Sequence, residues 1–383
     1  MIYRHTKEQI NDYFQAEGIN QSLLKVIITS GIQEFIKQRE LMLNQDEDLL
    51  EDKAHFIIGK AVDCWITQGK EAFDSMYHIS KLVKKPSDVE IVIIKTIFQK
   101  VAYLSNGDKN LYGNLADYPI YFYEAANTVP NGKDKDGKDK FGYYMNRKKD
   151  IVEEDGRLAN LLKTGVAELY WQDLIDAIGK QILTDGESTL ITTIVNSFLE
   201  HKHTSKLFEE RKDRDIIYQI PLFFEEAGVL CKILPDVIFI NHQTKTITPA
   251  DFKTTFVNIL TFNKQIEIRR YDFQGSFYTN GIKKNRDKIS KLIDKDISNY
   301  RVDSFGFIVE STTTPGTPVI FVLSKEVLEI GRIGDGRRKL GWLQALDLYK
   351  MWVKAEFSIE EMLRDTNGVL WIEGIDFSYN KIL

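Results

Sequence analysis

The sequence has 383 residues, of which 43% are hydrophobic and 28% are charged, so the chain can fill a substantial core. Lys and Arg total 51 against 56 Asp and Glu, and the resulting net charge of −5 excludes a protein that binds nucleic acid through its overall charge. Only two cysteines, Cys64 and Cys231, are present. They exclude an iron–sulfur cluster held by four cysteines and suit a reducing compartment. The first residues lack a signal-peptide pattern, and no window resembles a membrane span, so we expect a soluble cytoplasmic protein.

The first half of the chain shows helical periodicity. It predicts helices over residues 6–37, 54–69, 89–103, 157–180 and 188–208. Between them, the charged segment NTVPNGKDKDGKDKFGYYMNRKKD at 127–150 is expected to be a mobile loop insertion.

The period changes to that of strands beyond residue 214. Strands are predicted at 215–224, 229–240, 246–254, 304–310 and 318–323, with helices at 265–281 and 324–355. This order predicts an α/β (α+β) fold with a central mixed sheet, flanked by helices and by a helical N-terminal half. We expect a single domain over 1–383, with a mostly helical part at 1–210, a core at 211–356 and a C-terminal extension at 357–383.

Two carboxylates and a lysine are predicted to converge in the stretch LPDVIFINHQTKTITPADFKTT. An antiparallel hairpin centred on its turn puts Asp236 directly across from Asp251, where like charges repel. Alternation along the strand turns Asp251 and Lys253 to one face and Phe252 to the other. Such a set suits a divalent cation and a phosphate. Pro249 could shift the register by one residue, and a hairpin with solvated charges at its open end remains the alternative.

The predicted helix after this hairpin carries a polar stripe. In QIEIRRYDFQGSFYTNG, the residues Arg270, Gln274 and Tyr278 follow at i, i+4 spacing. A helix at this place can lay Gln274 and Tyr278 beside a metal or a substrate. The alternative is an amphipathic helix whose polar side faces solvent.

These two stretches together resemble the PD-(D/E)XK nuclease superfamily, in which a carboxylate, a short hairpin and then Asp or Glu, any residue and Lys form the core motif. Gln274 and Tyr278 resemble the additional Q-x-x-x-Y motif of its RecB-like branch. Further stretches are similar, in order, to segments of RecE-like exonucleases of the exonuclease VIII type from phages and prophages, over roughly 19–350 and most weakly over 80–150. They read INQSLLKVIITS, HFIIGKAVDCWIT, ITTIVNSFLEHKHTSKLFEE and EEAGVLCKILPDVIF.

The resemblance implies a role for each matched residue. Asp236 and Asp251 would bind Mg²⁺ or Mn²⁺ together with the Phe252 backbone carbonyl, and Lys253 would be the catalytic lysine. The family usually has a His where this chain has Asp63 in GKAVD. A carboxylate on so apolar a helix needs a metal or a cationic partner, and an oxygen ligand suits Mg²⁺ better than imidazole does. We therefore expect Asp63 to be a third metal ligand.

Basic residues are candidates for contact with DNA, although a run of charge is more often a solvated face. Lys232 lies four residues before Asp236 on the same predicted strand face and could reach the site, or could pair with one of its carboxylates. The other candidates are Arg270 on the predicted helix, and Arg332, Arg337, Arg338 and Lys339 in GRIGDGRRKLGW.

The resemblance implies a metal-dependent exonuclease that digests one strand of double-stranded DNA from its end, 5′→3′, in a bacterium or a phage-infected host. Its partners would be DNA ends and a single-strand annealing recombinase, and a ring-shaped homo-oligomer is expected by analogy. The alternatives are another RecB-like endonuclease or single-strand nuclease, and a catalytically disabled DNA-binding scaffold.

Overall fold

The computed structural model describes residues 1–44, 54–82, 84–106, 108–128, 130–133, 139–141, 154–302 and 304–353. The chain divides into two compact units, one of residues 1–70 and 190–383 and the other of residues 71–189. Residues 1–70 therefore belong with the predicted core rather than with the rest of the N-terminal half. The predicted C-terminal extension and most of the 127–150 loop lie outside the described residues, but β3 (Pro130–Lys133) and β4 (Asp139–Phe141) pair within that segment.

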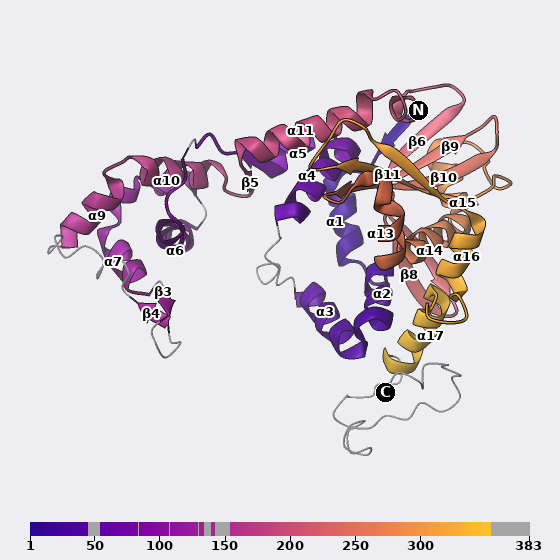
Figure 1. Ribbon diagram of the computed structural model, residues 1–383, viewed down its shortest axis with the longest axis horizontal. Helices are drawn as coiled ribbons and strands as arrows, with labels where there is room; N and C mark the ends of the chain where they lie inside the picture. Colours follow the sequence, from indigo (N-terminus) through magenta and orange to yellow (C-terminus); the bar gives the residue numbers. More distant parts are fainter. Residues whose placement is uncertain are drawn as a thin grey trace, which may run out of the picture. The chain divides into compact units, whose positions relative to one another are not determined.

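The first unit contains a six-stranded mixed sheet, which confirms the predicted fold class (Figure 1). β1 pairs in parallel with β6 and β10 in parallel with β11, whereas the β6–β9, β9–β10 and β11–β12 pairs are antiparallel. The strands in spatial order are β1 (Ile2–Arg4), β6 (Arg214–Tyr218), β9 (Val237–Asn241), β10 (Thr246–Thr255), β11 (Phe305–Ser311) and β12 (Val319–Leu323).

Two of the predicted strands are each split in the structure. The 215–224 prediction becomes β6 and β7 (Leu222–Glu226), and the 229–240 prediction becomes β8 (Val229–Ile233) and β9. β7 and β8 form a hairpin of their own outside the large sheet. The first break falls at Gln219, which has a left-handed φ of 46°, and the second at Leu234-Pro235, where the proline cannot donate to a ladder. Lys232 therefore lies on β8 whereas Asp236 immediately precedes β9, contrary to the prediction of one continuous strand.

Long predicted helices are also divided at positions of positive φ. The predicted 265–281 helix breaks at Arg270 (φ 55°), the 324–355 helix at Gly334 (φ 80°) and the 6–37 helix at Gly31 (φ 85°). The helices of this unit are α1 (Lys7–Gln15), α2 (Gln21–Ser30), α3 (Ile32–Asn44), α4 (Ala54–Gln68), α11 (Asp185–Glu200, which begins in the other unit), α12 (Ser205–Phe208), α13 (Phe262–Ile268), α14 (Tyr271–Lys284), α15 (Arg286–Ile293), α16 (Lys325–Ile333) and α17 (Trp342–Val353).

The largest core of this unit lies between one face of the sheet and α14. Ile238 and Ile240 of β9 and Ile247 of β10 pack there with Phe273 and Phe277 of α14. The spacing of two on the strands directs these side chains to a single face. α14 comes close to the sheet at Gly275, where an added Cβ would lie 2.7 Å from Leu323 Cδ1 and 3.1 Å from the Phe305 ring, so a larger residue would force these side chains to shift.

The second unit is mainly helical and has its own core, centred on the buried Trp171. The Trp171 indole nitrogen donates to the Gly113 carbonyl at 3.0 Å, and a short parallel strand pair completes the unit. Besides β3 and β4, its elements are α5 (Lys70–Met76, which begins in the first unit), β2 (Tyr77–Ile79), α6 (Asp88–Ser105), α7 (Pro119–Thr128), α9 (Glu154–Leu162), α10 (Val166–Asp176), β5 (Gln181–Leu183) and the short helices η2 (Lys109–Leu111) and η3 (Leu115–Asp117). Among the described residues, no helix is both long and apolar enough to cross a membrane.

Candidate active site

The hairpin of β9 and β10 has the predicted register. The ladder pairs Asn241 with Thr246 and Val237 with Ala250, and one further step sets Asp236 opposite Asp251. Asp236 Oδ2 accepts a hydrogen bond from the Phe252 backbone N–H at 2.8 Å, which fixes its carboxylate against the partner strand. No register shift arises at the proline in β10, because that residue precedes the start of the β11 ladder at Ala250.

Alternation along β10 separates its polar and apolar side chains as predicted. Asp251 forms an ion pair with Lys253 on one face of the sheet. Phe252 turns to the opposite face, where its ring lies 5.6 Å from that of Phe198 in α11 and 6.0 Å from that of Phe208 in α12. The two carboxylates therefore occupy the end of the same sheet face that carries the core isoleucines.

Gln274 is brought to this face by α14. Its side-chain amide donates to Asp251 Oδ1 at 2.6 Å, and both residues are buried. The two oxygens of Asp251 thus meet different partners, Gln274 and Lys253. Arg270 does not share the predicted stripe with Gln274, because the chain is left-handed at Arg270 and α14 begins only at Tyr271.

Asp63 reaches the site from α4. This helix passes close to β10, and a Cβ added at Gly59 would lie 3.4 Å from the Thr254 hydroxyl. Asp63 Oδ2 accepts from the side-chain amide of Gln219 at 2.9 Å, while the Gln219 backbone N–H donates to the Asp236 carbonyl at 3.2 Å. Gln219 therefore links the Asp63 carboxylate to the backbone of Asp236. Sequence reasoning missed it, because the stretch QIP around this glutamine carries no pattern that points to a site.

Burial and mutual repulsion shift the protonation of the carboxylates. Burial, and then the charge of Asp251, raise the pKa of Asp63 to about 7, although Lys253 and Gln219 act in the opposite direction. The same causes, together with the charge of Asp63, raise the pKa of Asp236 well above its ordinary value. Three carboxylates are therefore electrostatically coupled at this end of the sheet.

Two cations face these carboxylates. Burial alone would lower the pKa of Lys253, but Asp251, Tyr271 and Asp236 outweigh it and raise that pKa, so Lys253 stays an ammonium. Lys25 of α2 was not singled out from the sequence. Burial, followed by the positive charges of Lys253 and of two neighbouring arginines, lowers the pKa of Lys25, which places this side chain within electrostatic reach of the site.

Tyr278 lies one turn beyond Gln274 and is partly buried, with its ring 6.0 Å from that of Phe305. Burial, and then Tyr13, Asp251 and Asp236, raise the pKa of its hydroxyl well above the ordinary value. The hydroxyl therefore remains protonated and able to donate a hydrogen bond.

The donor atoms suit a hard divalent cation. Asp63 Oδ1 is buried without a hydrogen-bond partner among the described residues, and Asp251 Oδ2 meets only the Lys253 ammonium there. Carboxylate and carbonyl oxygens are the ligands that Mg²⁺ and Mn²⁺ prefer. The described residues contain no ready-made group of three His, Cys, Asp or Glu side chains for a metal. Metal binding would therefore require these side chains to move.

Two of the predicted DNA contacts are occupied by other interactions. Lys232 is buried, and its ammonium donates to the carbonyls of Tyr13, Phe14 and Ala16 at 2.9, 3.2 and 2.7 Å. It therefore caps the C-terminal end of α1, where a cation is favoured by unpaired carbonyls. It neither reaches the site nor pairs with one of its carboxylates.

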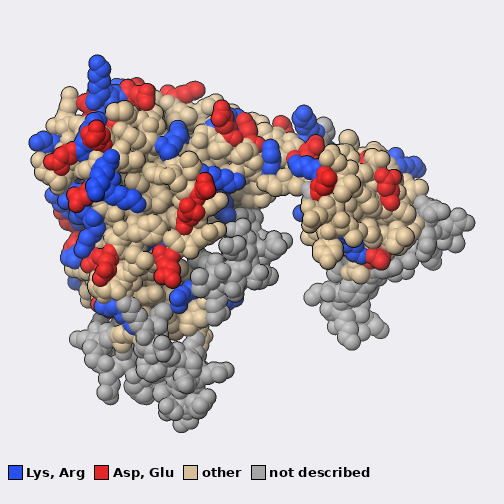
Figure 2. All heavy atoms as spheres, turned by 180° about the vertical axis from the view of Figure 1, so that it is seen from behind, with Lys and Arg blue, Asp and Glu red and all other residues tan. Residues whose placement is uncertain are grey.

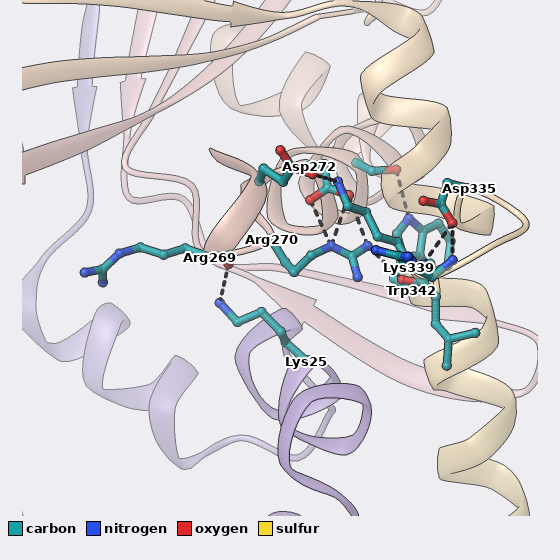
Figure 3. A network of polar contacts seen from close by, with 12 residues as sticks. Lys25, Arg269, Arg270, Asp272, Asp335, Lys339 and Trp342 are labelled. Atoms are coloured by element: carbon teal, nitrogen blue, oxygen red, sulfur yellow. Dashed lines mark hydrogen bonds and ion pairs between the residues drawn. The ribbon is translucent and has the colours of Figure 1, made fainter. Parts of the chain in front are cut away.

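Arg270 is the second of these residues (Figure 3). Its buried guanidinium pairs with Asp272 at 3.0 Å and donates to the Leu340 carbonyl at 2.7 Å. The neighbouring turn is held by Asp335, whose Oδ1 accepts from three successive backbone N–H groups, the last that of Lys339 at 2.9 Å. Arg270 therefore braces the basic turn against the start of α14.

The remaining basic candidates lie around this turn. Arg337 and Arg338 are exposed, Arg332 is exposed and pairs with Glu329 at 2.6 Å, and Lys339 pairs with Glu267 at 2.8 Å. On the face drawn in Figure 2, basic and acidic side chains are intermixed, as the small net charge implies. Contact of these residues with DNA stays a prediction.

Comparison with known proteins adds little to this geometry. No protein-family model matches the chain, and no curated protein matches it. Among solved structures, a protein of Eubacterium rectale named "putative exonuclease" aligns over 99% of this chain and 94% of its own, with 11% identity and a TM-score of 0.35. A likeness at this level carries no argument about function, which must come from the site itself.

Proposed function

We propose that this protein is a metal-dependent exodeoxyribonuclease that hydrolyses phosphodiester bonds of double-stranded DNA from an end. One observation carries the proposal. Asp236, Asp251, Lys253 and Gln274 converge at one end of the β9–β10 pair. The residues that match the RecB-like motif by their spacing in the sequence therefore also lie together in space, which supports the resemblance.

Each residue has a chemical task in this proposal. Asp63, Asp236, Asp251 and the Phe252 carbonyl would hold Mg²⁺ or Mn²⁺, which when bound lowers the pKa of a coordinated water and neutralises phosphate charge. Because its pKa is raised, Lys253 would serve as a cation beside the negative charge that develops on the phosphate rather than as a base.

The supporting residues would hold these groups in place. Gln274 fixes the orientation of Asp251 through its 2.6 Å hydrogen bond, and Gln219 holds Asp63 at 2.9 Å. Tyr278 keeps its proton and can donate to a phosphate oxygen. Orientation of catalytic groups by fixed neighbours lowers the cost of reorganisation during the reaction.

The test is digestion of linear duplex DNA labelled at one 5′ end, with Mg²⁺, Mn²⁺ or EDTA. We expect metal-dependent release of the terminal label as mononucleotides by the wild type and by Lys291→Met, an exposed control. Asp251→Ala and Lys253→Met should each release none. Digestion polarity follows from moving the label to the 3′ end.

Two results would contradict the proposal. Cleavage of a closed circular duplex or of single strands alone would indicate another RecB-like nuclease. Binding of DNA without cleavage of any of these substrates, by protein that folds normally, would indicate a non-catalytic scaffold.

A further inference from the structure

The segment between β10 and α14, residues 256–269, lies beside the candidate site at both of its ends. It begins three residues after Lys253 and ends five residues before Gln274. Its helix α13 packs beside α14 beneath the sheet (Figure 1). Because the strand and the helix that it joins both carry site residues, this connecting segment borders the place where a substrate strand would lie.

The connecting segment is anchored by one buried side chain. Phe262 is 2% exposed, and its ring lies 5.2 Å from that of Phe321 and 5.8 Å from that of Tyr271. The first turn of the connecting segment is closed by the Asn258 side chain, which accepts a hydrogen bond from the Leu260 N–H at 3.0 Å. The segment is therefore fixed at its middle and at its beginning.

Despite this anchoring, the segment exposes large apolar side chains. Phe256 is 63% exposed, Leu260 77% and Ile268 71%. Their exposure does not come from a shortage of core, because Phe262 of the same segment is fully packed. Three large apolar side chains left exposed within 13 residues of an anchored segment indicate an interaction surface.

Basic side chains accompany these apolar residues. Lys264 and Arg269 are exposed, and Figure 3 shows the Arg269 side chain extending away from the Arg270–Asp272 pair. Lys25 donates to the Arg269 carbonyl at 3.3 Å, which adds a third cation at the end nearest the site. Glu267, an acidic residue of the segment, is paired with Lys339. The available charge is therefore positive, which favours an anionic ligand over an apolar one.

A second aromatic residue lies on α4 near the same strand end. A Cβ added at Gly59 would lie 3.4 Å from the Thr254 hydroxyl, and Phe56, one turn earlier on the same helix face, is 49% exposed. Because α4 packs against β10, with Gly59 beside Thr254 and Asp63 one turn further toward the carboxylates, Phe56 lies on the side of Gly59 that faces away from the carboxylates.

We propose that the connecting segment binds unpaired single-stranded DNA, with Phe256 stacked on a nucleobase and Lys264 and Arg269 at the backbone phosphates. Exposed aromatic side chains beside a positive surface are the chemistry that holds single strands irrespective of sequence. The proposal rests on the proposed nuclease function, since it gives the strand being cut a place beside the carboxylates. Phe256 would be a positioning residue for that strand.

The test measures binding of a short fluorescent oligothymidylate to the full chain in EDTA, where no cleavage occurs. Phe256→Ala should weaken binding roughly tenfold, the loss of one stacked base. Phe14→Ala, in which a phenylalanine of matched exposure (65%) is removed from α1, should leave it unchanged. The wild type should bind an oligonucleotide with one abasic position more weakly than the intact oligonucleotide. Phe256→Ala should bind the abasic oligonucleotide as tightly as the wild type does, because the same stacking contact is already lost. Lys264→Gln with Arg269→Gln should reduce the slope of affinity against salt.

Unchanged affinity in Phe256→Ala would overturn the proposal. If that variant also sedimented as a smaller species than the wild type, the segment would be a surface between copies of the chain. Failure of the two proposals can be told apart. Binding that depends on Phe256, without hydrolysis by the wild type in metal, refutes only the nuclease function. Hydrolysis by the wild type with unchanged binding in Phe256→Ala refutes only the single-strand site on the connecting segment.

Discussion

Replacement of Asp63 by asparagine should stabilise the metal-free protein, and more so at higher pH. The carboxyl is buried, its Oδ1 has no hydrogen-bond partner among the described residues, and its pKa is raised to about 7 from 3.8. Between these two pH values the folded chain binds more protons at this site than the unfolded chain does. The free energy of unfolding therefore falls as pH rises through that window, and asparagine, which does not titrate, removes this fall.

The size of the change in unfolding free energy follows from the raised pKa of Asp63. One pKa unit corresponds to roughly 1.4 kcal/mol. The interval from pH 5 to the raised pKa of about 7 therefore predicts a gain in Asp63→Asn that is about 3 kcal/mol larger at pH 8 than at pH 5. The asparagine side chain can keep the hydrogen bond with Gln219. Any effect of the substitution on packing should be the same at both pH values, so it cancels when the two are compared.

The assay is urea unfolding in EDTA at pH 5 and pH 8, with Asp12→Asn on the exposed face of α1 as the matched control. The control should change the free energy of unfolding by the same small amount at pH 5 and at pH 8. An Asp63→Asn effect of equal size at pH 5 and pH 8 would refute a buried, coupled carboxylate at this position. Adding Mg²⁺ at pH 8 should stabilise the wild type and leave Asp63→Asn much less affected if Asp63 is a metal ligand.

Three further substitutions test the contacts around the site. Gln274→Leu removes a donor from the buried Asp251 and should lower the free energy of unfolding by about 1–3 kcal/mol, measured with urea; no loss would show that the hydrogen bond is unimportant. Lys253→Met should cost about 3 kcal/mol by leaving Asp251 without its cation, and much less in an Asp251→Asn background, whereas additive effects would contradict a direct pair. Because Lys232 caps α1, Lys232→Met should speed amide hydrogen exchange in α1 and leave exchange in β10 as in the wild type. Faster exchange only around the carboxylates would instead place Lys232 at the candidate site.

Local sequence pattern was sufficient to predict the hairpin of the candidate site. A period of two fixes which side chains share a face, and the length of the turn fixes the register, so Asp236, Asp251 and Lys253 could be placed together from local pattern alone. The mixed sheet also followed from the order of elements. These features depend on residues that are close in the chain.

Packing between distant elements determines which further residues complete the site and which predicted residues lie away from it. Gln219 meets Asp63 across 156 positions of sequence, and Lys25 meets the Arg269 carbonyl across 244. Lys232 is removed from the site because its strand joins a separate hairpin, and Arg270 because the chain turns left-handed there. Strand breaks, left-handed positions and long-range hydrogen bonds are set by packing between elements, and local periodicity carries no information about them.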